Sequence, residues 1–276
     1  MTGMDRYAVV GNPIAHSRSP QIHEAFARDA RQAMRYERLL APIDGFAATV
    51  ADFAARGGMG LNVTVPFKLQ ALALAHSASD RAKAAGAANT LKRDGDGWYG
   101  DNTDGAGVLR DIEANHGVAL AGRDVLVLGA GGAARGMLLP LAAARPRTLA
   151  IANRTASKAD ALARDMAPHA KVEAIPLAAL GARRFDVIIN ATSAGLTGDV
   201  ALPWPATIFA PGAFAYDIVY ADTPTLFLRF AKDAGVTRCA DGLGMLIEQA
   251  AEGFALWRGV RPDTAPVFAL LRPPRA

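Results

Sequence analysis

The stretch from residue 124 to residue 144, DVLVLGAGGAARGMLLPLAAA, constrains the fold more than any other part of the chain. It joins a continuous apolar strand to an apolar helix through a glycine-rich turn. A strand without polar alternation is typical of a parallel sheet that is covered on both faces. The stretch therefore predicts a strand–turn–helix unit inside an α/β domain.

The turn itself, GAGGAA (129–134), has the spacing of a dinucleotide-binding fingerprint, because it follows a strand and opens a helix. Gly129 would allow the tight turn, Gly131 would let a pyrophosphate approach the backbone, and Ala134 would provide the third small residue. Unpaired amide groups at the helix N-terminus would donate to the phosphates. The predicted cofactor contacts along the turn are Gly129, Ala130, Gly131, Gly132 and Ala133. The alternative is a glycine-rich turn that binds no ligand.

The end of the following strand bears on which dinucleotide is bound. An NAD-binding unit usually has an acidic residue there, which binds the ribose hydroxyls. This chain has NRTASK (153–158), with Asn153, Arg154 and Thr155 followed by Lys158 and no carboxylate. A guanidinium offers paired donors to a 2′-phosphate, and a lysine adds positive charge. The sequence therefore favours NADP(H). The alternative is a helix capped by Thr155 beside a solvated arginine.

Strand-like and helix-like segments alternate along the rest of the chain. In the first part we expect strands at 6–11, 34–40 and 60–65, helices at 19–30 and 46–58, a turn region at 93–105, a helix to residue 115, and a hinge at 116–123. In the second part we expect further strands at 147–155, 185–195 and 213–220, and helices at 156–167, 225–235 and 241–259. This alternation predicts mostly parallel sheets with helical crossovers.

Length and composition narrow the class of protein. A chain of 276 residues predicts two domains, and 51% hydrophobic with 20% charged residues is a globular composition. The net charge of +4 is scattered singly, which argues against a nucleic-acid-binding stripe. Cys239 is the only cysteine and the five histidines lack metal-ligand spacing, so we expect no disulfide and no metal. Without a signal-peptide pattern or a long apolar run, we expect a cytoplasmic protein with no membrane segment.

Polar residues at several turns are candidate substrate ligands. In GNPIAHSRSP (11–20), Ser17 and Ser19 place two hydroxyls before a helix, where carboxylates and polyols are often bound. For Ser19 the alternative is an N-cap. In NVTVPFK (62–68), Thr64 ends a strand and Lys68 follows, and the alternative is a solvated lysine on a helix that Pro66 starts. GAANT (86–90) adds Asn89 and Thr90, and GDNTDG (100–105) adds Asn102 and Asp104, although Asn and Asp are common in turns.

Taken together, these stretches resemble the shikimate dehydrogenase family. The motifs occur in the family's order from about Tyr7 to about Val260: GNPIAHSRSPQIHEAF, NVTVPFK, GAANTL, GDNTDG, GAGGAARG, NRT, NATSAG and ADGLGMLIEQAA. The resemblance implies a two-domain α/β fold with a cleft between the domains. A substrate domain would span 1–104 and be joined by C-terminal helices at 244–276, and a Rossmann-like NADP-binding domain would span 105–243.

The resemblance also implies an activity, the reversible NADPH-dependent reduction of 3-dehydroshikimate to shikimate in aromatic amino acid and chorismate biosynthesis. It implies Lys68 and Asp104 as the catalytic pair. The substrate would be bound by Ser17 and Ser19 at its carboxylate, by Thr64, Asn89, Asp104 and Gln249 at its hydroxyls, and by Tyr220. The nicotinamide side would be lined by Asp80, Ile218 and Gly242. A monomer or homodimer is expected, with small-molecule partners only.

Two positions depart from the family pattern. Lys158 stands where the family often has arginine, which weakens bidentate phosphate contact, and Asp80 stands where a longer glutamate is often found. The alternative within the family is a quinate/shikimate dehydrogenase with a broader substrate range or NAD use, against which NRT argues. A non-catalytic NADPH-binding sensor is the alternative from another class, and Lys68 with Asp104 argues against it.

Overall fold

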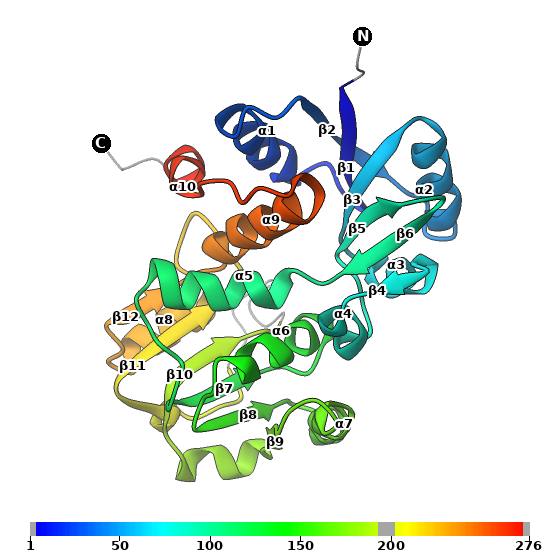
Figure 1. Cartoon of the computed structure of the whole chain (residues 1–276). Helices are drawn as coiled ribbons and strands as arrows, with labels where there is room; N and C mark the ends of the chain where they lie inside the picture. Colours follow the sequence, from blue (N-terminus) through cyan, green and yellow to red (C-terminus); the bar gives the residue numbers. More distant parts are fainter. Residues whose placement is uncertain (1–3, 193–201, 273–276) are drawn as a thin grey trace. The chain divides into compact units, whose positions relative to one another are not determined.

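The computed structural model describes residues 4–192 and 202–272. Two compact units divide the chain: unit 1 combines Met1–Gly107 with Ile247–Ala276, and unit 2 is formed by Val108–Leu246. In Figure 1 the blue, cyan and red segments belong to unit 1, and the yellow and most of the green segments belong to unit 2. The chain passes between the units twice, within helix α5 (Asp104–Arg110) and within helix α9 (Leu243–Arg258). The expected hinge at 116–123 lies entirely in unit 2.

Unit 1 is built on a sheet with the strand order β2-β1-β3-β5-β6-β4. Its strands are β1 (Asp5–Gly11), β2 (Met34–Leu40), β3 (Gly58–Val63), β4 (Ser77–Ala78), β5 (Thr90–Asp94) and β6 (Gly97–Asp101). β1 runs parallel to β2 and β3, through the crossover helices α1 (Ser19–Asp29) and α2 (Phe46–Ala55). The remaining helices are α3 (Lys68–Leu74), α4 (Asp80–Ala85) and α10 (Ala265–Leu271). The mostly parallel α/β fold expected here is confirmed.

β5 and β6 form an antiparallel hairpin, where the sequence predicted only a turn region. Gly95 lies in the turn with a φ of +56°, a conformation that favours glycine. The glycines and aspartates that suggested an open loop are the residues that tight hairpin turns select. β5 also pairs antiparallel with β3, which adds the hairpin to the sheet. Asn89 enters this hairpin and Asp104 follows it, so the hairpin places two candidate site residues.

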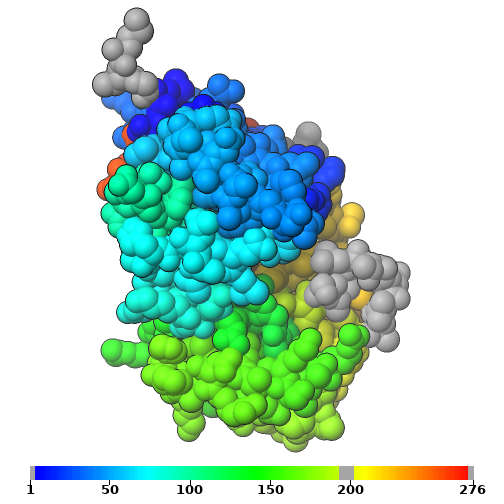
Figure 2. Space-filling view, turned by 90° about the vertical axis from the view of Figure 1, so that its right-hand side faces the viewer, coloured from blue at the N-terminus to red at the C-terminus, as the bar shows by residue number. Residues whose placement is uncertain are grey.

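The two faces of the unit 1 sheet are covered by different helices. Ala8 and Val10 of β1 belong to a cluster with buried side chains of α2 and α3. Tyr7 and Val9, which point to the opposite face, pack with Trp257 of α9. α2 and α3 lie side by side and form one continuous blue-to-cyan surface in Figure 2. Helix α9, from the far end of the chain, therefore completes the core of unit 1.

Unit 2 contains a fully parallel sheet with the order β12-β11-β10-β7-β8-β9. Its strands are β7 (Asp124–Leu128), β8 (Thr148–Ala152), β9 (Glu173–Ala174), β10 (Phe185–Asn190), β11 (Phe209–Asp217) and β12 (Arg238–Ala240). Counted from β7, this is the 3-2-1-4-5-6 order of dinucleotide-binding folds, with a topological switch point between β7 and β10. The expected Rossmann-like architecture is confirmed. The last residues of the expected strand at 185–195, part of the NATSAG motif, lie outside the described residues.

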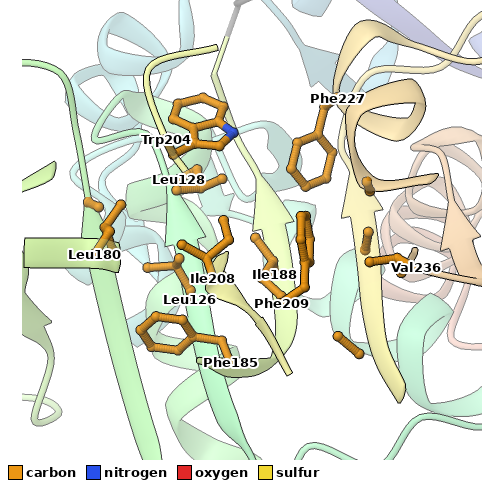
Figure 3. Packing of buried hydrophobic residues seen from close by; sticks show 14 of the residues in the cluster. Leu126, Leu128, Leu180, Phe185, Ile188, Trp204, Ile208, Phe209, Phe227 and Val236 are labelled. Carbon is orange, nitrogen blue, oxygen red and sulfur yellow. The ribbon is translucent and has the colours of Figure 1, made fainter. Parts of the chain in front are cut away.

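Both faces of this sheet are buried, because every residue from Val125 to Leu128 has no exposed surface. On one face, Leu126, Leu128 and Ile188 pack against aromatic and aliphatic side chains from the connecting segments (Figure 3). The α-helices of unit 2 include α6 (Gly132–Ala143), α7 (Ala156–Met166), α8 (Leu226–Asp233) and the first residues of α9. The end of α5 also lies in unit 2 and continues into a π-helical turn at Asp111–Asn115, so the helix expected to residue 115 is confirmed. A sheet buried on both sides is the reason for the unbroken apolar run that the sequence showed.

Within residues 4–192 and 202–272, no helix is long and apolar enough to cross a membrane. The same part of the chain contains no group of three or more His, Cys, Asp or Glu side chains that could hold a metal ion. Cys239 is a half-buried free thiol. Burial raises the pKa of this thiol, which makes it a weaker nucleophile at neutral pH.

Candidate active site

Lys68 and Asp104 meet in unit 1, although 36 residues separate them in the sequence. Each is the first residue of a helix, Lys68 of α3 and Asp104 of α5. Nζ of Lys68 donates to Oδ2 of Asp104 at 2.5 Å. The Asp104 side chain is 9% exposed and that of Lys68 is 29% exposed, so the lysine remains open to a ligand. An ammonium carries three donors, and Asp104 engages one of them.

Asn89 joins this pair from the start of the β5–β6 hairpin. Its Nδ2 donates to Oδ1 of Asp104 at 2.7 Å, so the two oxygens of the carboxylate are held by two different side chains. Oε1 of Gln249, on α9, lies 3.3 Å from the same amide nitrogen. Thr103, which the sequence did not suggest, donates its backbone N–H to Oδ1 of Asn89 at 2.8 Å. Four polar residues therefore surround Asp104 in one network.

The segment that carries Asp104 is fixed by a buried carboxylate three residues earlier. Asp101 accepts from Nε and Nη2 of Arg81 at 2.7 and 2.6 Å and from Oγ of Ser79 at 2.5 Å. Arg81 also donates to Glu252 of α9 at 3.0 Å. Burial alone would lower the pKa of Arg81, but the hydrogen bonds to Asp101 and Glu252 raise it, so the guanidinium stays charged. This ion cluster holds α9, and with it Gln249, against the hairpin.

The two predicted serines lie together at the start of α1. Oγ of Ser17 donates to Oγ of Ser19 at 3.2 Å and accepts from the Ser19 amide at 3.3 Å. The N-cap position of α1 falls on Arg18 and no side chain caps the helix, so Ser19 is not the N-cap that the sequence also allowed. Arg38 of β2 donates two hydrogen bonds to the carbonyl of Ser17, at 3.0 and 2.6 Å. A guanidinium therefore fixes the backbone of the serine loop.

Thr64 follows β3 at the carboxyl end of the parallel strands, where open α/β sheets bind ligands. Its amide donates to the carbonyl of Val10 at 3.0 Å. A Cβ on Gly11 would lie 2.5 Å from Cγ2 of Thr64, so only glycine permits this approach. The amide of Asn12 donates to the carbonyl of Val65 at 3.1 Å. These contacts join the serine-containing loop to the segment that carries Thr64 and Lys68.

In unit 2 the glycine turn lies between β7 and α6 as predicted. Gly129 has a φ of +110°, and a Cβ there would lie 2.8 Å from the carbonyl of Ala191 at the end of β10. Gly131 and Gly132 have no atom within 4 Å of where a Cβ would stand. The amides of Gly132 and Ala133 open helix α6. The turn thus leaves room for a pyrophosphate at a helix N-terminus, which is what a dinucleotide requires.

The NRTASK segment follows β8 and begins α7. Asn153 donates to the carbonyl of Thr155 at 2.9 Å, which shapes the turn. Thr155 occupies the N-cap position of α7, but its side chain makes no capping hydrogen bond. Arg154 and Lys158 are exposed, and within the described residues neither forms an ion pair. Thr155 therefore stands where the capping alternative placed it, without the capping hydrogen bond, and two cations are available to a phosphate.

The remaining predicted residues lie in two places. Ile218 and Gly242 are neighbours in unit 2, because a Cβ on Gly242 would lie 1.9 Å from the Ile218 carbonyl oxygen. Asp217 fixes the segment from Ile218 to Tyr220 by accepting from the Val219 amide at 3.1 Å. Burial raises the pKa of Asp217, and its hydrogen bonds oppose that effect. Asp80 belongs to unit 1, where its side chain is 94% exposed and lies 3.9 Å from Nζ of Lys83.

The sequence did not suggest a functional role for His23 or its neighbours. His23 has no exposed surface, and its ring stacks on Tyr36 with the centroids 4.3 Å apart. Nε2 of His23 lies 3.0 Å from Oδ1 of Asn62. Burial lowers the pKa of His23 to about 3, so the ring is neutral in the folded protein. The motifs IHEAF and NVTVPFK contained His23 and Asn62, but only the fold shows that they touch.

Acid should destabilise the protein through His23. In the unfolded chain a histidine has a pKa of about 6.5. Between about pH 6.5 and pH 3 the unfolded state binds a proton that the folded state excludes, so the free energy of unfolding falls by up to about 1.4 kcal/mol per pH unit. Urea unfolding at pH 6.5 and pH 5 should differ by about 1.5 kcal/mol more in the wild type than in His23→Gln. Equal differences in the two proteins would contradict a buried neutral His23, and the exposed His16 offers a control substitution.

The two units define a class of protein. Unit 2 is a dinucleotide-binding fold with an open glycine turn, and unit 1 places a lysine–carboxylate pair among amide and hydroxyl groups. A nucleotide-binding unit combined with such a proton-transfer pair is characteristic of a nicotinamide-dependent oxidoreductase that acts on a small polar molecule.

Comparisons with known proteins identify the family. The chain matches the family models for the shikimate dehydrogenase substrate binding domain over residues 9–91, shikimate / quinate 5-dehydrogenase over 112–197, and the shikimate 5'-dehydrogenase C-terminal domain over 242–272. It is 55% identical to the shikimate dehydrogenase (NADP(+)) of Nitrosospira multiformis across 97% of each chain. The chain belongs to the shikimate dehydrogenase family.

Two solved structures are similar to the whole chain. An Ael1 enzyme from Pseudomonas putida is 49% identical, with a TM-score of 0.93, and 98% of this chain and 99% of that chain are covered. The shikimate 5-dehydrogenase of Thermus thermophilus, solved with NADP(H) and shikimate, is 35% identical, with a TM-score of 0.84 and coverage of 95% and 96%.

Proposed function

We propose that this protein catalyses the reversible NADPH-dependent reduction of 3-dehydroshikimate to shikimate, a step of aromatic amino acid and chorismate biosynthesis. The observation that carries the proposal is the contact between Lys68 and Asp104, inside a network that includes Asn89 and Gln249. The NADP-dependent relatives at about 55% identity support both the substrate and the cofactor.

Lys68 is the proton-transfer residue in this proposal. When bound, NADPH supplies the hydride for the carbonyl carbon of 3-dehydroshikimate. The Lys68 ammonium donates a proton to the oxygen on that carbon, and in the reverse direction the amine accepts it from the hydroxyl. Asp104 holds one N–H of Lys68 through Oδ2, which directs the remaining donors of the ammonium toward the substrate.

The other predicted ligands bind and orient the substrate. Ser17 and Ser19 provide hydroxyl donors for the substrate carboxylate. Their positions are fixed by their contact with each other and by the two hydrogen bonds from Arg38 to the Ser17 carbonyl. The substrate hydroxyls are proposed to be bound by Thr64, Asn89, Asp104, Gln249 and Tyr220. Amides and hydroxyls suit a polyol because each can donate and accept.

The cofactor residues are proposed to act in three groups. The turn Gly129–Ala130–Gly131–Gly132–Ala133 would bind the pyrophosphate through backbone amides. Asn153, Arg154, Thr155 and Lys158 would hold the adenosine ribose and its 2′-phosphate. Ile218 and Gly242, with Asp80 from unit 1, would lie along the nicotinamide. The high exposure of Asp80 makes it the weakest member of this set.

Shikimate should be preferred over quinate, and NADP over NAD, in a four-way assay of oxidation. The carbon of quinate that bears the carboxylate is tetrahedral and carries an added hydroxyl. The proposed carboxylate site has little room for this group, because Ser19 is buried and its Oγ lies 3.2 Å from that of Ser17. A polar site that cannot pair an added group discriminates strongly, and we expect kcat/KM for quinate to be at least about a hundredfold lower. Comparable values would favour the broader quinate/shikimate alternative, and no NADPH formation from shikimate would support the non-catalytic sensor.

We also propose a cytoplasmic location and a monomeric or homodimeric state. The lone cysteine suits a reducing compartment, because no intrachain disulfide can form. Sedimentation velocity over a range of protein concentrations would separate monomer from dimer.

A further inference from the structure

A second set of polar side chains lies buried in unit 1 and leads away from Asp104. Its members are His23, Tyr36, Asn62 and Thr90, of which none is more than 6% exposed. They come from α1, β2, β3 and β5, so no single segment of the sequence contains them. Buried polar groups are costly unless they are hydrogen-bonded, and each donor here therefore has to meet an acceptor.

The amide of Asn62 is the branch point of this set. Its Oδ1 lies 2.7 Å from the hydroxyl of Tyr36 and 3.0 Å from Nε2 of His23. With the amide turned over, Nε2 would become an acceptor and the ring proton would move to Nδ1 of His23. That nitrogen is buried and has no partner, so the proton would lose its hydrogen bond. Nε2 therefore carries the proton, and Oδ1 of Asn62 accepts from both neighbours.

The hydrogen bonds continue in the same donor-to-acceptor direction through Thr90 to the active site. Nδ2 of Asn62 donates to Oγ1 of Thr90 at 3.2 Å, and Thr90 donates to Oδ1 of Asn89 at 2.9 Å. A hydroxyl has one hydrogen, so Thr90 cannot donate to both amides. Oδ1 of Asn89 accepts from Thr90 and also from the backbone N–H of Thr103 at 2.8 Å, so its Nδ2 faces Asp104. The hydrogen bonds point in one direction from His23 to Asp104.

We propose that His23 and Tyr36 are positioning residues for the reaction, because through Asn62 they keep the Thr90 hydroxyl as the second donor to Oδ1 of Asn89, beside the Thr103 backbone N–H, and so strengthen the orientation of that amide toward Asp104. The proposal rests on the function proposed for the site. If Asn89 turned over, its oxygen would face the carboxylate that it now contacts at 2.7 Å. Asp104 would lose a charge-assisted hydrogen bond and meet a repulsive dipole, which would move it relative to Lys68.

The two donors to Asn62 are redundant, which makes a double-mutant cycle the appropriate test. His23→Leu leaves the Tyr36 hydroxyl on Oδ1 of Asn62, and Tyr36→Phe leaves Nε2 of His23 there. Tyr36→Phe also removes a hydrogen-bonding contact with Ser19, so the KM for shikimate is measured beside kcat. Each single variant should leave kcat nearly unchanged. The double variant frees the Asn62 amide and releases the Thr90 hydroxyl from Asn89, while the Thr103 N–H stays in place, so it should lower kcat by about five- to tenfold, the effect of one neutral hydrogen bond. Losses that multiply without coupling would overturn the proposal.

Two further variants separate positioning from general destabilisation. His23→Gln keeps an N–H donor without an imidazole, so it should restore kcat when combined with Tyr36→Phe. Tyr7→Phe is the matched control, because Tyr7 is buried against the same Trp257 but its hydroxyl contacts Arg258 instead of Asn62. It should lower the melting temperature without the kcat loss. A kcat loss in Tyr7→Phe equal to that of the double variant would assign the effect to stability.

A spectroscopic measurement tests the direction of the network without any turnover. The ¹⁵N and ¹H NMR signals of His23 in the wild type should show a neutral ring with its proton on Nε2 at neutral pH. A proton on Nδ1 would overturn the proposal whatever the activity. If instead the wild type failed to oxidise shikimate while the tautomer was as expected, the proposed function would be wrong, and the hydrogen-bond direction would stand as a property of the fold alone.

Discussion

Replacing Lys68 with alanine is expected to lower kcat by at least about a hundredfold while the KM for shikimate changes little, because general acid–base help contributes roughly 10²–10⁴ in rate. Asp104→Asn should lose a comparable factor, since Oδ2 of Asp104 is the group that holds Nζ of Lys68 at 2.5 Å. Steady-state oxidation of shikimate, followed by NADPH absorbance, measures both constants. Folding should be retained, because the Lys68 side chain is 29% exposed and fills no core position.

The exposed Lys171 in unit 2 provides a matched lysine-to-alanine control that should leave kcat unchanged. A Lys68→Ala enzyme with near-normal kcat and a raised KM would make the lysine a binding residue. The proton would then have to reach the substrate oxygen from water or from Asp104.

Arg154→Ala is expected to raise the KM for NADP by about ten- to a hundredfold, with little change in the use of NAD. A hydrogen bond to a charged group contributes about 1.5–3 kcal/mol, which corresponds to that range. Arg154 is exposed just before α7, and we expect its guanidinium to bind the 2′-phosphate. Because the site is exposed, the difference should shrink as ionic strength increases.

Arg164→Ala gives the control for this second prediction. Arg164 lies in the last turn of the same helix and is also exposed, so its loss changes the net charge equally without reaching the N-terminal end. Equal losses with NADP and NAD in Arg154→Ala would show that the arginine supports the fold. If Arg164→Ala lost as much NADP affinity as Arg154→Ala, the net positive charge of the region would explain the preference, and no specific contact from Arg154 would be needed.

The sequence predicted elements well where one local pattern decides the structure. The run DVLVL is apolar after its first residue because its strand is buried on both faces, and the strand at 34–40 agrees with β2. The β5–β6 hairpin was missed because its Gly and Asp residues are typical of both loops and tight turns, and only pairing with β3 decides between them.

The site residues also divide into those that a local motif predicts and those that depend on contacts between distant segments. Lys68 and Asp104 could be proposed because both lie in motifs that resemble those of the shikimate dehydrogenase family, and the structure brings them together. His23 and Tyr36 could not, because their role depends on hydrogen bonds to a residue 39 and 26 positions away, respectively. The role of Asp80 remains a prediction, since its exposed side chain forms an ion pair only with Lys83 among the described residues.

The discontinuous unit 1 has a consequence for the order in which the sequences of the two units are completed during synthesis. Unit 2 is one continuous segment that ends at Leu246, whereas unit 1 needs Gln249, Glu252 and Trp257 from the segment after it. At about 5–20 residues per second, that last segment takes about 1.5–6 s to appear. The sequence of unit 2 is therefore complete at Leu246, before the chain has supplied the residues of α9 that complete unit 1.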